Sequence, residues 1–415
     1  MGVSEGRRRK SFLGCLLPWK SPSVSPVEAI VVKTRPPSKD LGTHLPVPDS
    51  EGPPELPVRA PDRLISSVVD QNDLRHLSFS RPEGSLNPRL QDALEKVNSW
   101  DEFDVFKVAE FSNGRPLYTV AMALLEQEGC LECKIDRQKA QKFLTAVEAA
   151  YQPSNPYHNS THAADVTQAA MVLLKSGNAM FSPLETFSLI VAATVHDLAH
   201  PGFTNDFLIN TRHERAVVYN DRSVNENYHV STCFRIAANE ETNIFSGLTK
   251  QEFNQCRRMI INAVLSTDMT QHFTLIERFT KGKLAEPDVS KWEDKDLLLQ
   301  MVLHAADLCN PCRPKYLSVK WAELVLMEFL EQGDTEASLG MDVTPMCDRR
   351  SVVVSTNQLR FIQWFLRPTM EECRTVTGDA FFEAAMRSLE ETERHWQEHE
   401  KLALEGKANP HAGFW

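Results

Sequence analysis

The sequence lacks several features that would place it in other protein classes. No apolar run reaches the length of about 18 residues that a membrane-spanning helix needs, so no transmembrane segment is expected. The pair Cys130-Leu131-Glu132-Cys133 has no second Cys-x-x-Cys partner, which argues against a zinc ribbon. The nine cysteines are dispersed and odd in number, a usage typical of reduced thiols in a cytosolic protein. No internal repeat is visible, and alternating strand patterns are scarce.

A surplus of basic residues is also missing. The 415 residues include 45 Lys and Arg against 56 Asp and Glu, a formal net charge of −11. Because Lys and Arg neutralise nucleic-acid phosphates, this balance argues against a general DNA- or RNA-binding protein. An anionic substrate would need local positive charge, and a bound metal ion is a compact source of it.

Composition divides the chain into three parts. Residues 1–85 form an arm rich in Pro and Ser without apolar periodicity, which predicts a disordered linker or regulatory segment. Periodic sequence follows, and we expect one large folded domain over 86–405 with a tail at 406–415. A hydrophobic content of 42% is sufficient for a sizeable core.

The start of the arm has three interpretations, which stay open. Residues 7–20 join a basic cluster to the apolar stretch Phe12–Leu17, but Pro18 ends the stretch too early for a signal peptide. An acylated Cys15 would favour peripheral membrane attachment of an otherwise cytoplasmic protein. The same basic-apolar pattern is typical of a calmodulin-binding segment, and a disordered tail is the third reading.

The folded part is predicted to be all-α, as a compact multi-helix domain rather than a simple bundle. Ser182-Pro183-Leu184-Glu185 is a capping box followed by a helix that is apolar nearly all round, so this helix should lie in the domain centre. A second capping box, Thr249-Lys250-Gln251-Glu252, precedes another helical pattern. Helical spacing also covers 297–306, 321–330, 359–366 and 381–404.

Polar residues of the types that bind metal ions, such as His and Asp, interrupt apolar sequence in four short segments: 157–166, 196–202, 223–229 and 304–311. His158 and His162 have i,i+4 spacing and would meet on one face of a helical turn. His196 and Asp197 follow the central helix, and Asp307 lies at the end of another apolar run.

A metal site explains this combination better than separate core residues. Taken singly, a buried His is more often a satisfied core residue, and an Asp at a helix end is usually a cap. A buried His–Asp pair is costly without partners, however, and here such ligand types end three helical segments. His and Asp ligands without Cys suit Zn²⁺ together with a harder ion such as Mg²⁺ or Mn²⁺.

These segments resemble the signature of the class I 3′,5′-cyclic nucleotide phosphodiesterases. The matching segments, in the family's order, are YHNSTHAADV, HDLAHPG, SVNENYH, STDM, HAADLCNP, EFLEQGD, PMCDR and NQLRFI. The resemblance covers roughly Leu86 to Leu404 and implies an HD-type phosphodiesterase fold with a binuclear metal site. It also implies hydrolysis of cAMP, cGMP or both to 5′-nucleoside monophosphates in cyclic nucleotide signalling.

The resemblance implies a role for each matched position of the metal centre. Four residues match the ligands of the first ion, usually zinc: His162, His196, Asp197 and Asp307. Asp197 would also bridge to a second ion, usually magnesium. His158 matches the general acid, and three further residues match groups around the bridging water and the ions: Glu226, His200 and Asp268.

Matched positions also imply a substrate pocket. Gln358 matches the glutamine that bonds the base, while Phe361 and Val325 match the two sides of an apolar clamp on the purine. Tyr157 and Asn310 match further pocket residues. The choice between adenine and guanine and the oligomeric state stay open.

The chain departs from the family pattern at Ala199, where an acidic residue is common, at Tyr228, where His is common, and at Arg360, where Gly is common. None of these removes a matched metal ligand, so an active enzyme is still expected. Two alternatives remain: a helical phosphohydrolase of nucleoside mono- or triphosphates, and a catalytically impaired nucleotide-binding or scaffold protein.

Overall fold

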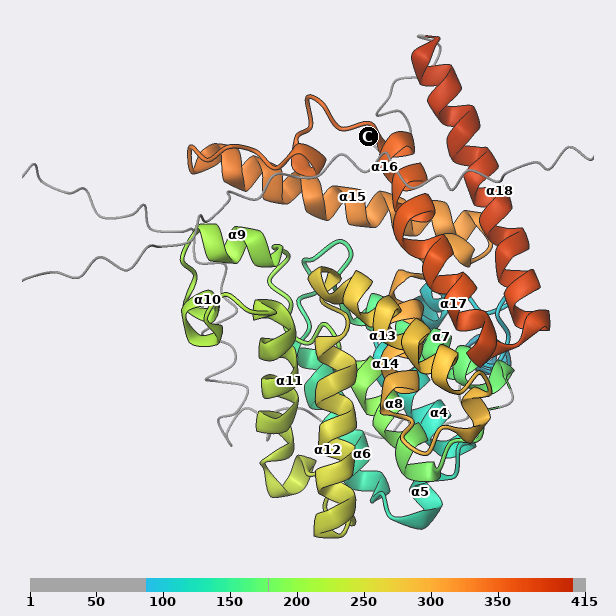
Figure 1. Cartoon of the computed structure of the whole chain (residues 1–415). Coiled ribbons are helices and arrows are strands. Elements are labelled where there is room, and N and C mark those ends of the chain that lie inside the picture. The colour runs from blue at the N-terminus through green and yellow to red at the C-terminus, as the bar shows by residue number, and fades with distance from the viewer. Residues whose placement is uncertain (1–86, 178, 406–415) are drawn as a thin grey trace, which may run out of the picture. The chain divides into compact units, whose positions relative to one another are not determined.

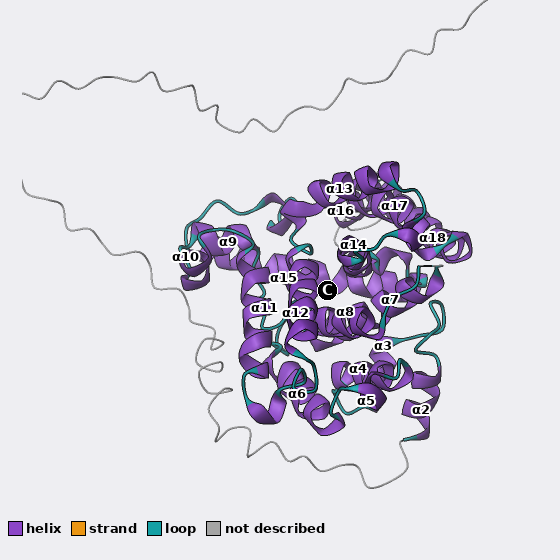
Figure 2. Ribbon diagram, turned by 60° about the horizontal axis from the view of Figure 1, so that its bottom comes forward, coloured by secondary structure: helices purple, strands orange, loops and turns teal. Residues whose placement is uncertain are grey.

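A computed structural model describes residues 87–405, apart from residue 178 and the side chains of 132 and 133. The described residues form helices and connecting loops without a strand, which confirms the all-α prediction (Figures 1 and 2). The first helices are α2 Pro88–Glu95, α3 Val105–Phe111, α4 Pro116–Gln127, α5 Cys130–Cys133, α6 Arg137–Ala150, α7 Ser160–Ser176, α8 Pro183–Val195, α9 Asn205–Asn210 and α10 Glu214–Tyr219. They are followed by α11 Val224–Ala237, α12 Lys250–Leu265, α13 His272–Ala285, α14 Asp296–Leu308, α15 Lys315–Ser338, α16 Val354–Phe361, α17 Arg367–Thr377 and α18 Asp379–Leu404.

Helix α8 lies at the centre of the domain, as its sequence predicts. Ser182 accepts a hydrogen bond from the Glu185 backbone N–H and Glu185 accepts one from the Ser182 N–H, so the capping box is formed. Every residue from Thr186 to Val195 is buried. Figure 2 shows α8 enclosed by α4, α7, α12 and α14, which all pack against it. Its C-terminal end therefore delivers His196 and Asp197 into the protein interior.

Two neighbouring helices direct their ends to the same place. Helix α7 begins after Asn159, whose side chain accepts hydrogen bonds from the backbone N–H groups of Thr161 and His162. It is buried from His162 to Leu174. Helix α14 packs on α7 and α8 and carries Asp307 in its last turn. The start of α7 and the ends of α8 and α14 thus converge.

The C-terminal helices contain one local departure from the predicted pattern. Helical spacing predicted a single helix over 359–366, but α16 ends at Phe361 and continues as a π-helical turn, Ile362–Leu366, before α17. Pro368 explains the wider turn, because proline has no N–H to donate to the carbonyl of Trp364 and its ring crowds that position. π-Helical turns of this kind are frequent at functional sites.

Other predictions concern segments that the structure does not describe. The arm at 1–85, the segment 7–20 and the tail at 406–415 lie outside the described residues, so these remain predictions. Within the described part, no helix combines the length and the apolar character needed to cross a membrane.

Candidate active site

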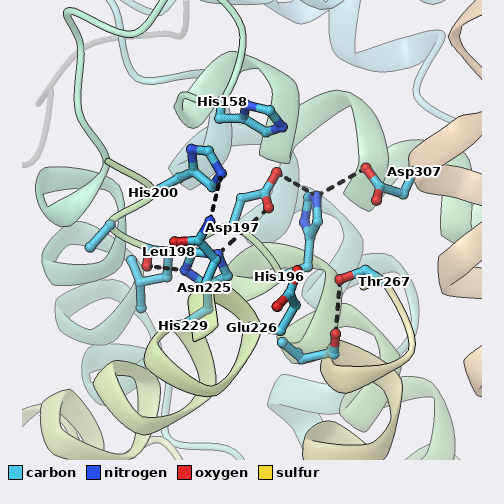
Figure 3. A network of polar contacts seen from close by, with 12 residues as sticks. His158, His196, Asp197, Leu198, His200, Asn225, Glu226, His229, Thr267 and Asp307 are labelled. Atoms are coloured by element: carbon cyan, nitrogen blue, oxygen red, sulfur yellow. Dashed lines mark hydrogen bonds and ion pairs between the residues drawn. The ribbon is translucent and has the colours of Figure 1, made fainter. Parts of the chain in front are cut away.

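One ligand atom from each of four residues meets where α7, α8 and α14 converge, and these atoms all lie within 4.8 Å of one another: His162, His196, Asp197 and Asp307. The Nε2 atom of His162 is 3.3 Å from His196 Nε2, 3.1 Å from Asp307 Oδ1 and 3.4 Å from Asp197 Oδ2. The Nε2 atom of His196 is 3.1 Å from Asp197 Oδ2 and 3.4 Å from Asp307 Oδ1 (Figure 3).

These spacings fit a divalent metal ion. Neighbouring ligands that each lie about 2.0–2.2 Å from one ion are separated by about 2.8–3.6 Å in a tetrahedral or octahedral arrangement. The Oδ2 atom of Asp197 is buried without a hydrogen-bond partner among the described residues, although two imidazole nitrogens lie within 3.4 Å of it. An unpartnered buried carboxylate oxygen is costly, and a cation removes that cost.

A hydrogen bond to the backbone determines which nitrogen of the His196 ring faces the other three side chains of the cluster. His196 Nδ1 donates to the Ala193 carbonyl at 2.8 Å, one turn back in α8, so that Nε2 is left for the ligand cluster. Burial raises the pKa of Asp197 and Asp307, but the neighbouring histidines together outweigh it and hold both pKa values below the ordinary range. Both carboxylates are therefore ionised, which is the form that a carboxylate needs to bind a metal ion.

His158 lies beside this cluster and is held by a carboxylate from a distant helix. Its Nδ1 is hydrogen-bonded to Glu328 of α15, which also accepts the backbone N–H groups of Tyr157 at 3.0 Å and His158 at 2.9 Å. Burial lowers the pKa of His158, but the charges of Glu328 and Asp197 outweigh it and raise this pKa to about 9. His158 is thus protonated at neutral pH and can donate a proton.

A layer of polar residues supports His158 and Asp197 from below (Figure 3). The ring of His200 stacks on that of His158 with centroids 4.0 Å apart, and its Nδ1 accepts the Gly202 N–H at 3.1 Å. Burial and the charge of His158 keep the pKa of His200 well below its ordinary value, so this ring is neutral. His229 Nδ1 donates to the Leu198 carbonyl at 2.6 Å, which leaves its Nε2 3.8 Å from Asp197 Oδ1.

Two further carboxylates lie nearby without joining the cluster directly. Glu226 accepts a hydrogen bond from Asn205 at 3.0 Å, and burial together with the charge of Asp268 raises its pKa to about 8. Asp268 accepts from Ser223 Oγ at 2.6 Å and from the Thr270 N–H at 2.8 Å. Within residues 87–405, no hydrogen bond or ion pair connects either carboxylate to the four clustered ligands.

The matched pocket residues fall into two groups. Tyr157 and Asn310 adjoin the four clustered side chains: Asn310 Nδ2 donates to the Tyr157 hydroxyl at 2.6 Å, and the Tyr157 ring centroid lies 4.4 Å from that of His162. The second group is Val325 on α15 with Gln358 and Phe361 on α16. Among the described residues, no hydrogen bond or ring contact joins this group to the four clustered side chains. Val325 and Phe361 are partly buried against the core.

Two of the three residues that depart from the family pattern contact the same arginine, Arg215. Ala199 is fully buried with a φ of 61°, and its carbonyl accepts a hydrogen bond from Arg215 at 3.1 Å. The Arg215 guanidinium in turn lies 3.6 Å from the ring centroid of Tyr228. Arg215 therefore connects two of the departing positions and helps to hold the turn after Asp197. Arg360 is exposed, so its side chain reaches solvent.

Sequence reasoning assigned no role to Glu328, His229 or Asn225. Asn225 donates to the Phe203 carbonyl at 3.0 Å and lies 3.5 Å from His200 Nε2. Glu328 carried a usable signal in the sequence, because it is a charged residue within an apolar stretch, and the structure shows that it is only 3% exposed.

Comparison with known proteins agrees with this geometry. Residues 157–386 match the family model described as 3′,5′-cyclic nucleotide phosphodiesterase. A rat 3′,5′-cyclic-AMP phosphodiesterase 4C is 39% identical over 293 residues, which cover 68% of this chain and 54% of that protein. A human dual specificity calcium/calmodulin-dependent 3′,5′-cyclic nucleotide phosphodiesterase 1B is 39% identical over 315 residues, 74% of this chain and 58% of that protein. The chain thus spans about half the length of these curated relatives.

A solved structure supports the same assignment. The phosphodiesterase domain of the RhoPDE fusion protein from the choanoflagellate Salpingoeca rosetta superposes with a TM-score of 0.67 at 29% identity, over 75% of this chain and 99% of that domain. The helical fold, the convergence of His and Asp ligands and the matched sequence lead to one conclusion. This chain belongs to the 3′,5′-cyclic nucleotide phosphodiesterase family.

Proposed function

We propose that this chain hydrolyses 3′,5′-cyclic nucleotides, cAMP or cGMP or both, to 5′-nucleoside monophosphates in cyclic nucleotide signalling. The observation that carries the proposal is the position of His158 beside the four clustered ligand atoms, because a proton donor next to a metal site is what phosphodiester hydrolysis requires. The relatives named for this reaction match the chain over the same residues.

The four clustered residues would hold one divalent ion, proposed to be zinc: His162, His196, Asp197 and Asp307. Asp197 would also face a second ion, proposed to be magnesium or manganese, with Glu226, His200 and Asp268 ordering the groups around it. When bound, such a pair of ions neutralises phosphoryl oxygens and makes hydroxide available from water at neutral pH.

The chain's own catalytic contribution is proton donation. Cleavage of the bond between phosphorus and the 3′ oxygen leaves an alkoxide, which departs poorly unless it receives a proton. Because Glu328 engages Nδ1 of His158, the Nε2–H of the imidazolium is the proton that His158 can give to this oxygen. General-acid catalysis of this kind typically contributes about 10²–10⁴ in rate.

The substrate base is proposed to bind between α15 and α16. Phe361 and Val325 would contact the two faces of the purine, and Gln358 would hydrogen-bond its edge because one amide can both donate and accept. Tyr157 and Asn310 adjoin His162, one of the four clustered residues. Asn310 Oδ1 is buried without a partner among the described residues, which leaves an acceptor for the substrate.

Residues 7–20 are proposed as a partner contact of a cytoplasmic enzyme. Their basic-apolar pattern fits calmodulin or an anionic membrane surface, and a relative is named as calcium/calmodulin-dependent. Binding of the full chain and of a chain lacking residues 1–20 to calcium-loaded calmodulin, and separately to anionic vesicles, distinguishes the two. Equal binding by both chains would refute this contact.

A steady-state assay of the full chain with both cyclic nucleotides tests the proposed activity. We expect 5′-monophosphate release that chelation of divalent ions abolishes and metal addition restores. Hydrolysis of nucleoside mono- or triphosphates in place of cyclic nucleotides would favour the first alternative, a different phosphohydrolase. Metal binding without any hydrolysis would favour the second, an impaired nucleotide-binding protein.

A further inference from the structure

We propose that His272 is a positioning residue for the base pocket, acting through Phe365 on Phe361. This inference rests on the proposed function, because Phe361 is there assigned to one face of the purine. His272 is the first residue of α13 and is fully buried. His272 lies outside the matched motifs and has no part in the proposed proton transfer.

A buried hydrogen bond fixes the His272 ring. Its Nδ1 lies 2.8 Å from Nε2 of His304, which is also fully buried and precedes the ligand Asp307 by one turn of α14. Burial lowers the pKa of both rings, that of His304 to about 4, so both are neutral at physiological pH. One N–H and one lone pair then form a matched donor and acceptor, and the orientation of His272 is tied to the metal-bearing helix.

The other side of the His272 ring faces the turn next to the proposed pocket. Its centroid lies 5.2 Å from that of Phe365 with the rings at 68°, an edge-to-face contact. Phe365 belongs to the π-helical turn Ile362–Leu366, and its ring stacks on Phe361 at 6.1 Å and 29°. Figure 1 shows α13, α14 and α17 side by side, in agreement with their packing contacts.

These contacts form a series from His304, one helical turn before Asp307, to the proposed base pocket: His304, His272, Phe365 and Phe361. A π-helical turn lacks the regular hydrogen bonding of an α-helix, so side-chain contacts have more influence on where its rings lie. Without His272, Phe365 would lose one of its supports. The expected consequence is weaker binding of the base, while the chemistry at the ions is unchanged.

Two substitutions separate the contacts of His272. His272→Asn places an amide near the position of Nδ1 and can keep the bond to His304, but it removes the ring from Phe365. His272→Phe restores a ring against Phe365. Because an aromatic pair contributes modestly, His272→Asn should raise KM for the cyclic nucleotide about two- to tenfold with little change in kcat. His272→Phe should return KM towards the original value.

Phe365→Leu removes the ring that lies between His272 and Phe361, so it should raise KM as His272→Asn does. Bound metal and thermal unfolding are measured for every variant, so that a folding defect is recognised by loss of both. A KM that stays unchanged in folded, metal-loaded His272→Asn and Phe365→Leu proteins would overturn the proposal. So would a fall in kcat with KM unaltered.

A double-mutant comparison distinguishes this inference from the proposed function itself. Phe361→Ala alone should raise KM, and a failure to do so refutes the proposed base pocket. If Phe361→Ala raises KM, adding His272→Asn should have little further effect, because both changes remove the same support. Fully additive effects would show that His272 does not act through Phe361, and the inference would fail while the proposed function stands.

Discussion

Glu328 binds the imidazole of His158 although 170 residues separate the two in the chain. The same carboxylate accepts the backbone N–H groups of Tyr157 and His158, so it fixes both the ring and the segment that carries it. A single buried carboxylate of α15 thus holds the segment that leads into α7. Burial raises the pKa of this carboxyl, but the charge of His158 and the hydrogen bonds that His158 donates together outweigh that effect, and the pKa falls to about 2.

Glu328→Gln should shift the pH dependence of catalysis. Glu328 contributes most to the rise of the His158 pKa to about 9, so the protonated acid is present below that pH and is lost as the pH rises through it. Without the carboxylate charge the pKa falls, and the basic limb of the kcat/KM profile should move to lower pH. A profile measured from pH 6 to 10 checks this, and an unmoved basic limb would contradict the role of Glu328.

His158→Ala should separate proton donation from metal binding. The variant lacks the proposed acid but keeps all four clustered ligands, so kcat should fall by about 10²–10⁴ while metal content is retained. Steady-state kinetics and metal analysis of the same preparation measure both quantities. Full activity would refute the assignment of His158.

Asp307→Ala should empty the proposed zinc site. It removes one of the four clustered oxygen and nitrogen ligands, so bound zinc should be lost and hydrolysis with it. The matched control is Asp334→Ala, which removes a largely exposed carboxylate paired with Arg349. Metal analysis should separate the two variants, and zinc retained by Asp307→Ala at the level of the control would argue against its role as a ligand.

Ser182→Ala tests the cap that starts the central helix. The substitution removes the side-chain acceptor of the capping box, so the free energy of unfolding should fall by about 1 kcal/mol. Denaturant unfolding measures this change. Because Ser182 is exposed and lies at the opposite end of α8 from His196, kcat should not change, and an activity loss without destabilisation would be unexpected on this account.

The sequence was informative where structure depends on local pattern. Capping boxes and apolar spacing predicted α8 and α12, because caps and helix periodicity act over a few residues. The same reasoning placed His196, Asp197 and Asp307 at helix ends and favoured a metal site there, while the family resemblance supplied the role of each residue.

Other features depend on contacts between distant segments and left little local trace. The bond between Glu328 and His158 needs α15 to cross the start of α7, and the bond between His272 and His304 joins two different helices. The π-helical turn at 362–366 required the effect of Pro368 on a helix that periodicity alone describes as regular. Tertiary packing, rather than residue pattern, determines the two hydrogen bonds, whereas the π-helical turn follows from a single local proline.

The most direct test of the account is the anomalous scattering of zinc in crystals of the metal-loaded protein. The account predicts a peak within about 2.0–2.2 Å of His162 Nε2, His196 Nε2 and carboxylate oxygens of Asp197 and Asp307. A zinc peak coordinated by other residues, or zinc-loaded crystals in which these four side chains hold none, would contradict it.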